Sequence, residues 1–386
     1  MKRIVVLGGY GGMGSVCVRD LVKTSSDCEI VVAGRDERKA KAFAKSIGKR
    51  VSWTKADASD VNGMARAFKG ADVVVNCAQY YLNLNVMKAC LKSKSNYLDL
   101  GGLYHTTLKQ LKLDKQFKKI KRLAILGCGS SPGITNVMAE YGGRTLDRID
   151  AAHFYFADKD WSKYDQPFVI PYSPDTLLDE FNLKAAVLEN GKAKLVPAMS
   201  SPKELEFPAP VGRVKGYRIL HSEVATIPRL YKNKGIKECD FRECFPDDFV
   251  DKINFLIRTG LASEKPLEPR GVKPRDVVVR VLSQWLPKPK TKIDDIEFLV
   301  AELDGYKGGK RTKVKVICKA HSLGSVPAGT LDTGVPPSIM AQMIANGEIR
   351  KTGAMEPGFC VDPEKFFEEL KKRGMHVYME TEERVD

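Results

Sequence analysis

The sequence contains no hydrophobic run that approaches the about 20 residues of a membrane-spanning helix. It also has no recognisable secretory leader, because Met1–Arg3 leads directly into a short apolar stretch without a small-residue cleavage site. Its nine cysteines are scattered and odd in number, which is typical of a reducing compartment and not of a disulfide framework. These absences predict a cytoplasmic protein that does not associate with a membrane.

Motifs for metal binding and for nucleic-acid recognition are absent as well. Cys239 and Cys244 form a C-x4-C pair without a second pair nearby, so we predict no metal site. The net charge is +15, from 63 Lys and Arg against 48 Asp and Glu, but no zinc-finger or basic-aromatic motif accompanies it. We attribute the excess to solvated helix faces that attract anionic small molecules, and expect no nucleic-acid partner.

The sequence does contain a glycine-rich turn at its start. Residues 4–7 form an apolar stretch that predicts a buried strand, and a helical segment follows from Ser15. Between them Gly9, Gly11 and Gly14 fit the GxGxxG spacing, while the crowded glycines also allow frames that start at Gly8. Glycine permits the sharp turn and lets backbone amides at the helix N-terminus approach a diphosphate. The stretch therefore predicts a dinucleotide cofactor.

Strand and helix patterns then alternate through the first third of the chain. The expected strands are 29–33, 51–54, 72–76, 97–100 and 122–126, and the expected helices are 37–47, 61–68, 82–91, 107–119 and 133–142. This alternation predicts right-handed βαβ units and hence a doubly wound parallel sheet of the Rossmann type, an α/β fold. Ligands of such a sheet bind beyond the carboxyl ends of its strands. The cofactor contacts expected there are Gly9, Tyr10, Gly11, Gly12, Met13, Gly34, Arg35, Asp57, Ala58, Asn76, Cys77, Ala78, Gly101 and Gly102.

The end of the second strand bears on the choice of cofactor. NAD-binding sheets usually carry an acidic residue there, which bonds the ribose 2′-hydroxyl. Here Gly34 leaves room for a 2′-phosphate, and Arg35 and Arg38 can clamp it. Asp36 keeps NAD possible, although capping the next helix is a sufficient role for it. We therefore favour NADP over NAD.

After about residue 148 strict alternation stops, which indicates an α+β second domain. Strands are expected at 149–156, 214–224, 295–302 and 312–320, with a hairpin at 186–196 around Asn190-Gly191. Helices are expected from 174, at 247–259 and 274–285, and over 334–345 and 363–373. We predict a cofactor domain over 1–132, a substrate and dimerisation domain over 133–333, and C-terminal segments over 334–386 that pack back on the first domain.

Two stretches carry side chains suited to acid–base chemistry. Tyr104 and His105 follow the fifth strand, at the nicotinamide end of a cofactor laid across this sheet; a surface or capping histidine is the alternative. His221, Glu223 and Arg229 lie close together in the second domain, where the arginine can hold a substrate carboxylate. An ordinary loop salt bridge is the alternative there. We assign catalytic roles to Tyr104, His105 and Glu223, and substrate contacts to His221 and Arg229.

Residues 127–136 form a small-residue loop that leads into a helix. This loop suits close backbone contact with cofactor or substrate, and we place Gly133 among the substrate contacts. Cys128 would be a reactive thiol if the helix end lowered its pKa. The alternative is that Cys128 is a small residue that simply fits its surroundings.

A short-chain dehydrogenase is the main rival interpretation. Asn76-Cys77-Ala78 resembles the NAG motif of that family, and Tyr155 and Lys159 match its YxxxK pair. That chemistry requires the tyrosine and lysine on one helix face. Residues 153–156 have the pattern of a strand, so we interpret the match as coincidence.

At these stretches the sequence resembles the saccharopine dehydrogenase-like family, in its reductase and lysine 6-dehydrogenase branch. The similar segments extend in order over essentially the whole chain: 5–14, 72–81, 96–105, 127–142 (GCGSSPGITNVMAEYG), 221–229, 334–349 (GVPPSIMAQMIANGEI) and 366–374. The resemblance implies a Rossmann domain, an α+β domain that contacts substrate and forms a homodimer, and C-terminal segments that return to the first domain.

The resemblance also implies hydride transfer between NAD(P) and a C–N bond of an amino acid or its imine. Saccharopine reductase, lysine 6-dehydrogenase and carboxynorspermidine reductase act in this way. Lysine 6-dehydrogenase-like members carry an acid at the position of Gly34, from which this chain departs. The expected partner is a small amino-acid-like substrate. The alternatives are a non-catalytic NADP-binding redox sensor and a short-chain-dehydrogenase-type carbonyl reductase.

Overall fold

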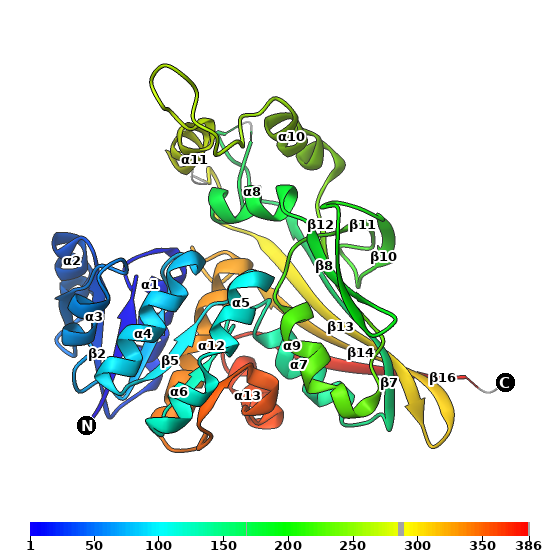
Figure 1. Cartoon of the computed structure of the whole chain (residues 1–386), viewed down its shortest axis with the longest axis horizontal. Helices are drawn as coiled ribbons and strands as arrows, with labels where there is room; N and C mark the ends of the chain where they lie inside the picture. Colours follow the sequence, from blue (N-terminus) through cyan, green and yellow to red (C-terminus); the bar gives the residue numbers. More distant parts are fainter. Residues whose placement is uncertain (167, 285–288, 385–386) are drawn as a thin grey trace.

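The computed structural model describes residues 1–166, 168–284 and 289–384 (Figure 1). A seven-stranded sheet, all of whose pairs are parallel, occupies the N-terminal part in the order β15-β6-β5-β4-β1-β2-β3. Its strands are β1 (Lys2–Leu7), β2 (Cys28–Gly34), β3 (Val51–Lys55), β4 (Val73–Asn76), β5 (Asn96–Asp99), β6 (Leu123–Ile125) and β15 (Gly353–Met355). This arrangement confirms the predicted Rossmann-type α/β fold.

Helices cover both faces of this sheet. Ile4 and Val6 of β1 face one core while Val5 and Leu7 face the other, which explains the unbroken apolar run of this strand. The first core also takes residues from α1 (Gly12–Thr24), α2 (Glu37–Ile47) and α12 (Ala328–Ala345). The second takes residues from α3 (Val61–Ala67), α4 (Asn83–Ser93), α5 (Tyr104–Leu111) and α6 (Asp114–Lys119), and the turn η1 (Tyr80–Leu82) precedes α4.

A mixed nine-stranded sheet forms the second part, with the path β10-β11-β12-β7-β13-β14-β16 and a side branch in which β8 pairs with β12 and β9. Its longest strands, β7, β13 and β14, cross the molecule diagonally in Figure 1. The strands are β7 (Arg148–Asp160), β8 (Ala185–Glu189), β9 (Lys192–Val196), β10 (Lys203–Glu206), β11 (Arg213–Arg218), β12 (Glu238–Cys244), β13 (Asp295–Lys307), β14 (Lys310–His321) and β16 (His376–Glu383).

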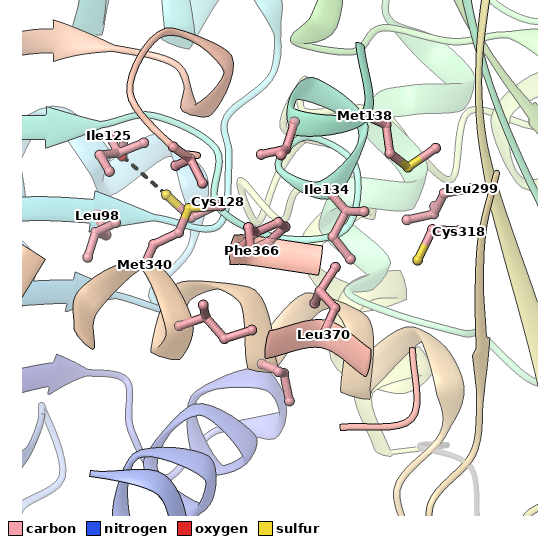
Figure 2. Close-up of a cluster of buried hydrophobic side chains, with 14 of the residues drawn as sticks. Leu98, Ile125, Cys128, Ile134, Met138, Leu299, Cys318, Met340, Phe366 and Leu370 are labelled. Carbon is pink, nitrogen blue, oxygen red and sulfur yellow. Dashed lines mark hydrogen bonds between the residues drawn. The ribbon is translucent and has the colours of Figure 1, made fainter. Parts of the chain in front are cut away.

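The two sheets share one continuous apolar core (Figure 2). Leu98 and Ile125 come from the first sheet, and Leu299 and Cys318 come from the second. Between the sheets lie α7 (Ile134–Gly143), α9 (Glu223–Leu230), α12 and α13 (Pro363–Lys371). A separate lobe with its own core is built from α8 (Pro174–Asn182), α10 (Asp247–Arg258) and α11 (Pro274–Gln284). The 3-10 turns η2 (Lys232–Lys234) and η3 (Pro357–Phe359) complete the elements.

Several local predictions are confirmed. Asn190 and Gly191 both have positive φ, as the hairpin turn between β8 and β9 requires. Asp36 accepts a hydrogen bond from the amide of Lys39 and caps α2. Tyr155 and Lys159 lie in β7 and not on a helix, so the tyrosine–lysine arrangement of a short-chain dehydrogenase is not formed. The expected helix end at Trp285 lies outside the described residues.

Four local predictions are wrong. The helix expected over 107–119 is interrupted at residues 112–113, and the break lets Leu111 of α5 and Phe117 of α6 both reach the same core. The strand expected over 214–224 ends at Arg218, and α9 begins at Glu223. The helix expected from Gly334 begins instead at Ala328, whose amide bonds the Asp295 carboxylate. Residues 334–386 do not all return to the first sheet, since β16 joins the second.

Candidate functional site

The glycine turn between β1 and α1 is determined by close backbone contacts. A Cβ atom at Gly14 would lie 2.2 Å from the carbonyl oxygen of Gly8, and one at Gly9 would lie 2.9 Å from that of Val6. A Cβ atom at Gly12, the first residue of α1, would have no neighbouring atom within 4 Å. The turn therefore presents the unpaired amides of a helix N-terminus to an exposed cradle, which fits the diphosphate of a dinucleotide.

The ribose end of the cradle lies where β2 and β3 end. A Cβ atom at Gly34 would lie 2.3 Å from Cε1 of Tyr10, so the Tyr10 ring occupies the place of the acidic residue common in NAD sites. Arg35, the next residue, is exposed, and the amide of Asp36 donates to the Tyr10 hydroxyl at 3.1 Å. Hydrogen bonds from Ser59, together with the charge of Arg35, lower the pKa of Asp57 at the end of β3. Arg35 and Lys55 are thus cationic side chains near this end of the cradle.

Buried polar groups order the loops after β4 and β5. The Asn76 amide donates to Oδ1 of Asn83 at 2.8 Å, and Oδ1 of Asn76 accepts from the amide of Ala78 at 3.1 Å. Oδ1 of Asp99 accepts from the amides of Gly101 at 3.0 Å and Gly127 at 2.7 Å. Sequence reasoning missed Asp99, which resembles an ordinary strand-end residue until β5 and β6 are placed side by side. Asn76 and Asp99 therefore position the strand ends that border the predicted nicotinamide site.

The loop over residues 127–133 connects the two parts of the molecule. Its Cys128 is fully buried, and burial raises the pKa of this thiol, which favours the packing role over the reactive one. The Ser130 hydroxyl lies 3.1 Å from that of Thr333 in α12, and the Ser131 hydroxyl donates to Oε1 of Glu223 at 3.0 Å. This loop therefore touches both α12 and α9.

A histidine–glutamate pair faces this loop from the second domain. Nδ1 of His221 is hydrogen-bonded to Oε2 of Glu223, and Oε1 of Glu223 also accepts from the Thr135 hydroxyl at 2.9 Å. The imidazole stacks on Phe241 with 3.9 Å between ring centroids. Burial alone would lower the pKa of His221, but the charge and hydrogen bond of Glu223 outweigh it and raise that pKa. The charge and hydrogen bond of His221 and the hydrogen bond from Thr135 outweigh the burial of Glu223 and lower its pKa, so both shifts favour the imidazolium–carboxylate form of the pair.

The other predicted catalytic and substrate residues are placed differently. His105 is exposed at the start of α5 and its ring contacts that of Tyr104, while α5 as a whole contacts α9. Arg229 is also exposed, and its charge acts on Asp114, whose pKa is lowered, and on Glu356, whose pKa burial nevertheless raises to about 8. The structure thus brings His221 and Glu223 together. The charge of Arg229 acts instead on Asp114 of α6 and on Glu356, which precedes η3.

Sequence reasoning also missed the contacts of α8 with the first domain. The Tyr80 hydroxyl donates to Oδ2 of Asp179 at 2.6 Å, and Arg275 pairs with the other oxygen of that carboxylate at 2.8 Å. The Gln79 amide lies 3.4 Å from the Ser173 hydroxyl. These contacts close α8 over the loop that follows β4. Nothing in the local pattern of residues 172–182 could have indicated them, because both partners lie about a hundred positions away.

A Rossmann-type sheet with a diphosphate cradle, beside a second domain in which a buried histidine–glutamate pair lies at the start of α9, is the architecture of a two-domain dinucleotide-dependent oxidoreductase. Residues 4–125 match the model of the saccharopine dehydrogenase NADP binding domain, and residues 129–375 match that of the saccharopine dehydrogenase C-terminal domain. The chain belongs to the saccharopine dehydrogenase family and is an NAD(P)-binding oxidoreductase of that kind.

Relatives with similar sequences are named for polyamine compounds. Carboxyaminopropylagmatine dehydrogenase of Synechocystis sp. is 24% identical, over 97% of this chain and 96% of its own length. Carboxynorspermidine synthase of Vibrio cholerae is 25% identical, over 95% of this chain and 94% of its own length. The expectation of lysine or saccharopine as the specific substrate is therefore not supported by these relatives.

Two solved structures share the whole fold. Apo saccharopine dehydrogenase (L-Glu forming) from Saccharomyces cerevisiae has a TM-score of 0.77 at 16% identity and covers 99% of this chain and 100% of its own. Homospermidine synthase from Legionella pneumophila, solved in complex with NAD, has a TM-score of 0.69 at 15% identity and covers 98% of this chain and 91% of its own. In the part of the chain that the structure describes, no helix is long and apolar enough to span a bilayer.

Proposed function

We propose that this protein transfers a hydride from NADPH to the imine formed between an amine of polyamine type and a small carboxyl-bearing aldehyde, giving a carboxyalkyl polyamine. The observation that carries the proposal is the His221–Glu223 ion pair, which is held by Ser131 and Thr135 at the edge of the cofactor sheet. Relatives named for carboxyaminopropylagmatine and carboxynorspermidine support the polyamine class. The substrate would be a small molecule bound between the two sheets.

His221 is suited to the acid role in this reaction. As an imidazolium it can donate a proton to the imine nitrogen, which makes the imine carbon a better hydride acceptor. Glu223 holds the proton on Nδ1 and compensates the charge, so Nε2 carries the proton that can be transferred. When bound, NADPH supplies the hydride at its nicotinamide. Alignment of the reacting atoms between the loop and this pair would contribute much of the rate.

Arg35 is the residue on which cofactor choice can be tested. We expect wild type to bind NADPH at least tenfold more tightly than NADH, because Arg35 can bond the 2′-phosphate and no carboxylate stands at Gly34. Arg35→Ala should remove most of this difference, whereas Arg66→Ala, which changes an exposed arginine of α3, should not. Equal dissociation constants for the two cofactors in wild type would show that the NADP preference is wrong.

NADPH oxidation tests the chemistry. The protein would be mixed with aspartate semialdehyde or α-aminoadipate semialdehyde, and with agmatine, 1,3-diaminopropane, lysine or glutamate as the amine. We expect agmatine and 1,3-diaminopropane to support turnover at least tenfold better than lysine and glutamate. Turnover with glutamate or lysine alone would favour an amino-acid oxidoreductase, and no turnover with any amine would favour the redox-sensor alternative.

A further inference from the structure

A row of acidic side chains crosses the face of the second sheet that points toward α12 and the first domain. Glu243 of β12, Asp158 of β7 and Glu297 of β13 belong to it. Glu297 is the direct cross-strand partner of Asp158, and Glu243 pairs with Phe156, two positions along β7. Their chain neighbours Ala157, Cys244 and Phe298 belong to the core on the opposite face of the sheet. The three carboxyl groups therefore share one face on consecutive strands.

Two further carboxyl groups extend this row at its ends. The Tyr172 hydroxyl donates to Glu180 of α8 at 2.5 Å and lies 3.3 Å from Glu243, so it links these two residues. At the other end Asp332 of α12 lies within hydrogen-bond reach of Glu297. We define the acidic row as Glu180, Glu243, Asp158, Glu297 and Asp332.

Asp332 shows that the row is incomplete as it stands. The residue is 1% exposed, and among the residues that the structure describes no N–H group bonds its carboxylate oxygens, whose neighbours are the Glu297 carboxyl group and the Thr333 hydroxyl. Glu297 is 4% exposed, and the facing position is Gly329, whose missing side chain leaves the carboxylate uncovered on that side. A buried carboxyl group that faces a second carboxyl group and has no N–H donor is costly, so this end of the row is suited to a cation that the chain itself does not provide.

His221 is the positive charge that acts on the Glu180 end of the row, and the other four carboxyl groups have no salt bridge in the described part of the chain. Within residues 1–166, 168–284 and 289–384, no lysine or arginine forms a salt bridge with any of its five carboxyl groups. Among the groups that act on the row, the His221 cation and the Thr333 hydroxyl lower the pKa of a carboxyl group, whereas Glu223, Asp160, Asp179 and Asp295 raise one. Like charges on facing strand positions destabilise a sheet, so the arrangement needs a counter-charge.

The pKa values of the row reflect this imbalance. Burial raises the pKa of Asp332 to about 7. Burial raises the pKa of Glu180 to about 7 as well, and that of Glu297 is also raised by burial and by Asp332. Without a cation the row holds protons near neutral pH, and a bound cation would displace them.

We infer that the acidic row binds the spaced ammonium groups of a linear polyamine chain on the substrate, with Glu297 and Asp332 at the end farthest from His221. Neighbouring strands are about 4.8 Å apart, close to the separation of nitrogens in an extended three-carbon diamine. No three described side chains are grouped as ligands for one metal ion, and Asp158 remains exposed within the row. Spaced ammonium groups fit this geometry better than a single ion.

The row also has the right connection to the reacting centre. Thr333, next to Asp332, lies 3.1 Å from the Ser130 hydroxyl, and Glu223 bonds Ser131 of the same loop. The Asp332 end of the row therefore adjoins the loop that borders the cofactor cradle, and the charge of His221 acts on Glu180 at the other end. A polyamine on the row would place one nitrogen near His221 while the remainder lies on the second sheet.

Isothermal titration calorimetry of the full chain with norspermidine tests the row without requiring turnover. We expect saturable binding and, from two buffers of different ionisation enthalpy at pH 7, release of at least one proton for each triamine bound. Propylamine carries a single ammonium group and should bind at least tenfold more weakly. Binding of norspermidine no tighter than that of propylamine, or binding without proton release, would overturn the inference.

Substitutions at the Glu297 and Asp332 end of the acidic row test whether norspermidine binds there. Glu297→Gln and Asp332→Asn should each raise the dissociation constant of norspermidine at least tenfold. Gly329→Ala is a second probe that keeps both charges, because its Cβ would lie 2.5 Å from Oε2 of Glu297. Glu302→Gln is the matched control: it lies on β13, bonds Tyr155 instead, and should change the constant less than twofold. Unchanged binding in all three row variants would contradict the assignment.

The inference rests on the proposed function, but the two fail separately. If norspermidine binds to the row and no imine is reduced, the proposed reaction is wrong and the polyamine site stands. If a polyamine imine is reduced with the same KM in wild type, Glu297→Gln and Asp332→Asn, the row is not the polyamine site and the reaction stands.

Discussion

Single backbone contacts determine the shape of the cofactor cradle, and Gly14 is the residue at which this can be tested. Gly14→Ala would place a Cβ 2.2 Å from the Gly8 carbonyl oxygen, a separation that requires α1 to move away from the turn. We expect at least a tenfold rise in the dissociation constant for NADPH and a loss of about 1–3 kcal/mol in the free energy of unfolding. Fluorescence titration and urea denaturation measure the two effects.

Gly12→Ala is the matched control for this turn. Because nothing lies within 4 Å of an added Cβ there, the variant should fold with unchanged or slightly higher stability. Its methyl group would point into the cradle, so NADPH binding should weaken while the free energy of unfolding does not fall. Equal stability losses in both alanine variants would contradict this account of the turn.

The His221–Glu223 pair yields a second prediction at the residue scale. Glu223→Gln removes the charge that outweighs the burial of His221, so the pKa of His221 should fall below its ordinary value. We expect kcat to drop about a hundredfold or more, because an imidazole is no longer charged at neutral pH. An NMR pH titration of the histidine ring protons measures the pKa directly.

Thr135→Val is the control for that pair. It removes the 2.9 Å hydrogen bond to Glu223 but leaves the charge, so the pKa of His221 should stay raised. If the histidine titrates identically in wild type and Glu223→Gln, the imidazolium–carboxylate description is wrong.

Parts of the site whose residues lie close together in the sequence could be predicted, and parts formed by residues far apart in the sequence could not. The cradle was predictable because the strand, the glycines and the helix start lie within fourteen consecutive residues. Gly34 was interpreted as space for a phosphate, and the structure adds that Tyr10 packs against it. The acidic row gave no signal, because Glu243 and Glu297 come together only through the order of β12, β7 and β13.

At the scale of elements, a buried ion pair joins α1 to the C-terminal helices. Asp20 of α1 accepts from Nε of Arg373 at 2.7 Å and from the Ser338 hydroxyl of α12 at 2.6 Å. Asp20→Ala would leave the buried arginine with Glu369 as its remaining acidic partner. We expect a loss of about 3 kcal/mol in the free energy of unfolding, measured by urea denaturation.

An exposed ion pair provides the comparison. Arg213 and Glu206 form a salt bridge in which both side chains are more than half exposed. Arg213→Ala should therefore change the free energy of unfolding by less than about 0.5 kcal/mol. A similar cost in both variants would mean that burial does not distinguish the two pairs.

The start of α12 shows why some helix ends could not be predicted. Pro336 and Pro337 indicate a helix N-terminus when only neighbouring residues are considered, because proline is tolerated in the first turn. The helix instead begins at Ala328, where Asp295 of β13 caps it from 33 positions away. Gly334 lies against Met13 and Val16 of α1, so packing retains the prolines inside the helix. Tertiary capping and packing thus overrode the local preference.

At the scale of the whole molecule, the uncompensated carboxyl groups predict how stability depends on pH. The pKa values of Glu180 and Asp332 are both raised by burial to about 7. Each folded pKa lies above the unfolded value, so the folded chain binds more protons near neutral pH than the unfolded chain does. The free energy of unfolding must therefore fall as pH rises through this window. The raised pKa of His221 acts in the same direction.

We expect the ligand-free chain to lose on the order of 2 kcal/mol between pH 6 and pH 8, measured by urea denaturation at constant ionic strength. The double variant Glu297→Gln with Asp332→Asn should flatten this dependence, because fewer buried carboxyl groups then ionise. Glu302→Gln should leave the dependence as in wild type. Norspermidine should restore stability most at pH 8, where the acidic row is most fully charged and binds the triamine most tightly. A free energy of unfolding that is constant or rises from pH 6 to pH 8 would mean that the row is already compensated in the folded chain.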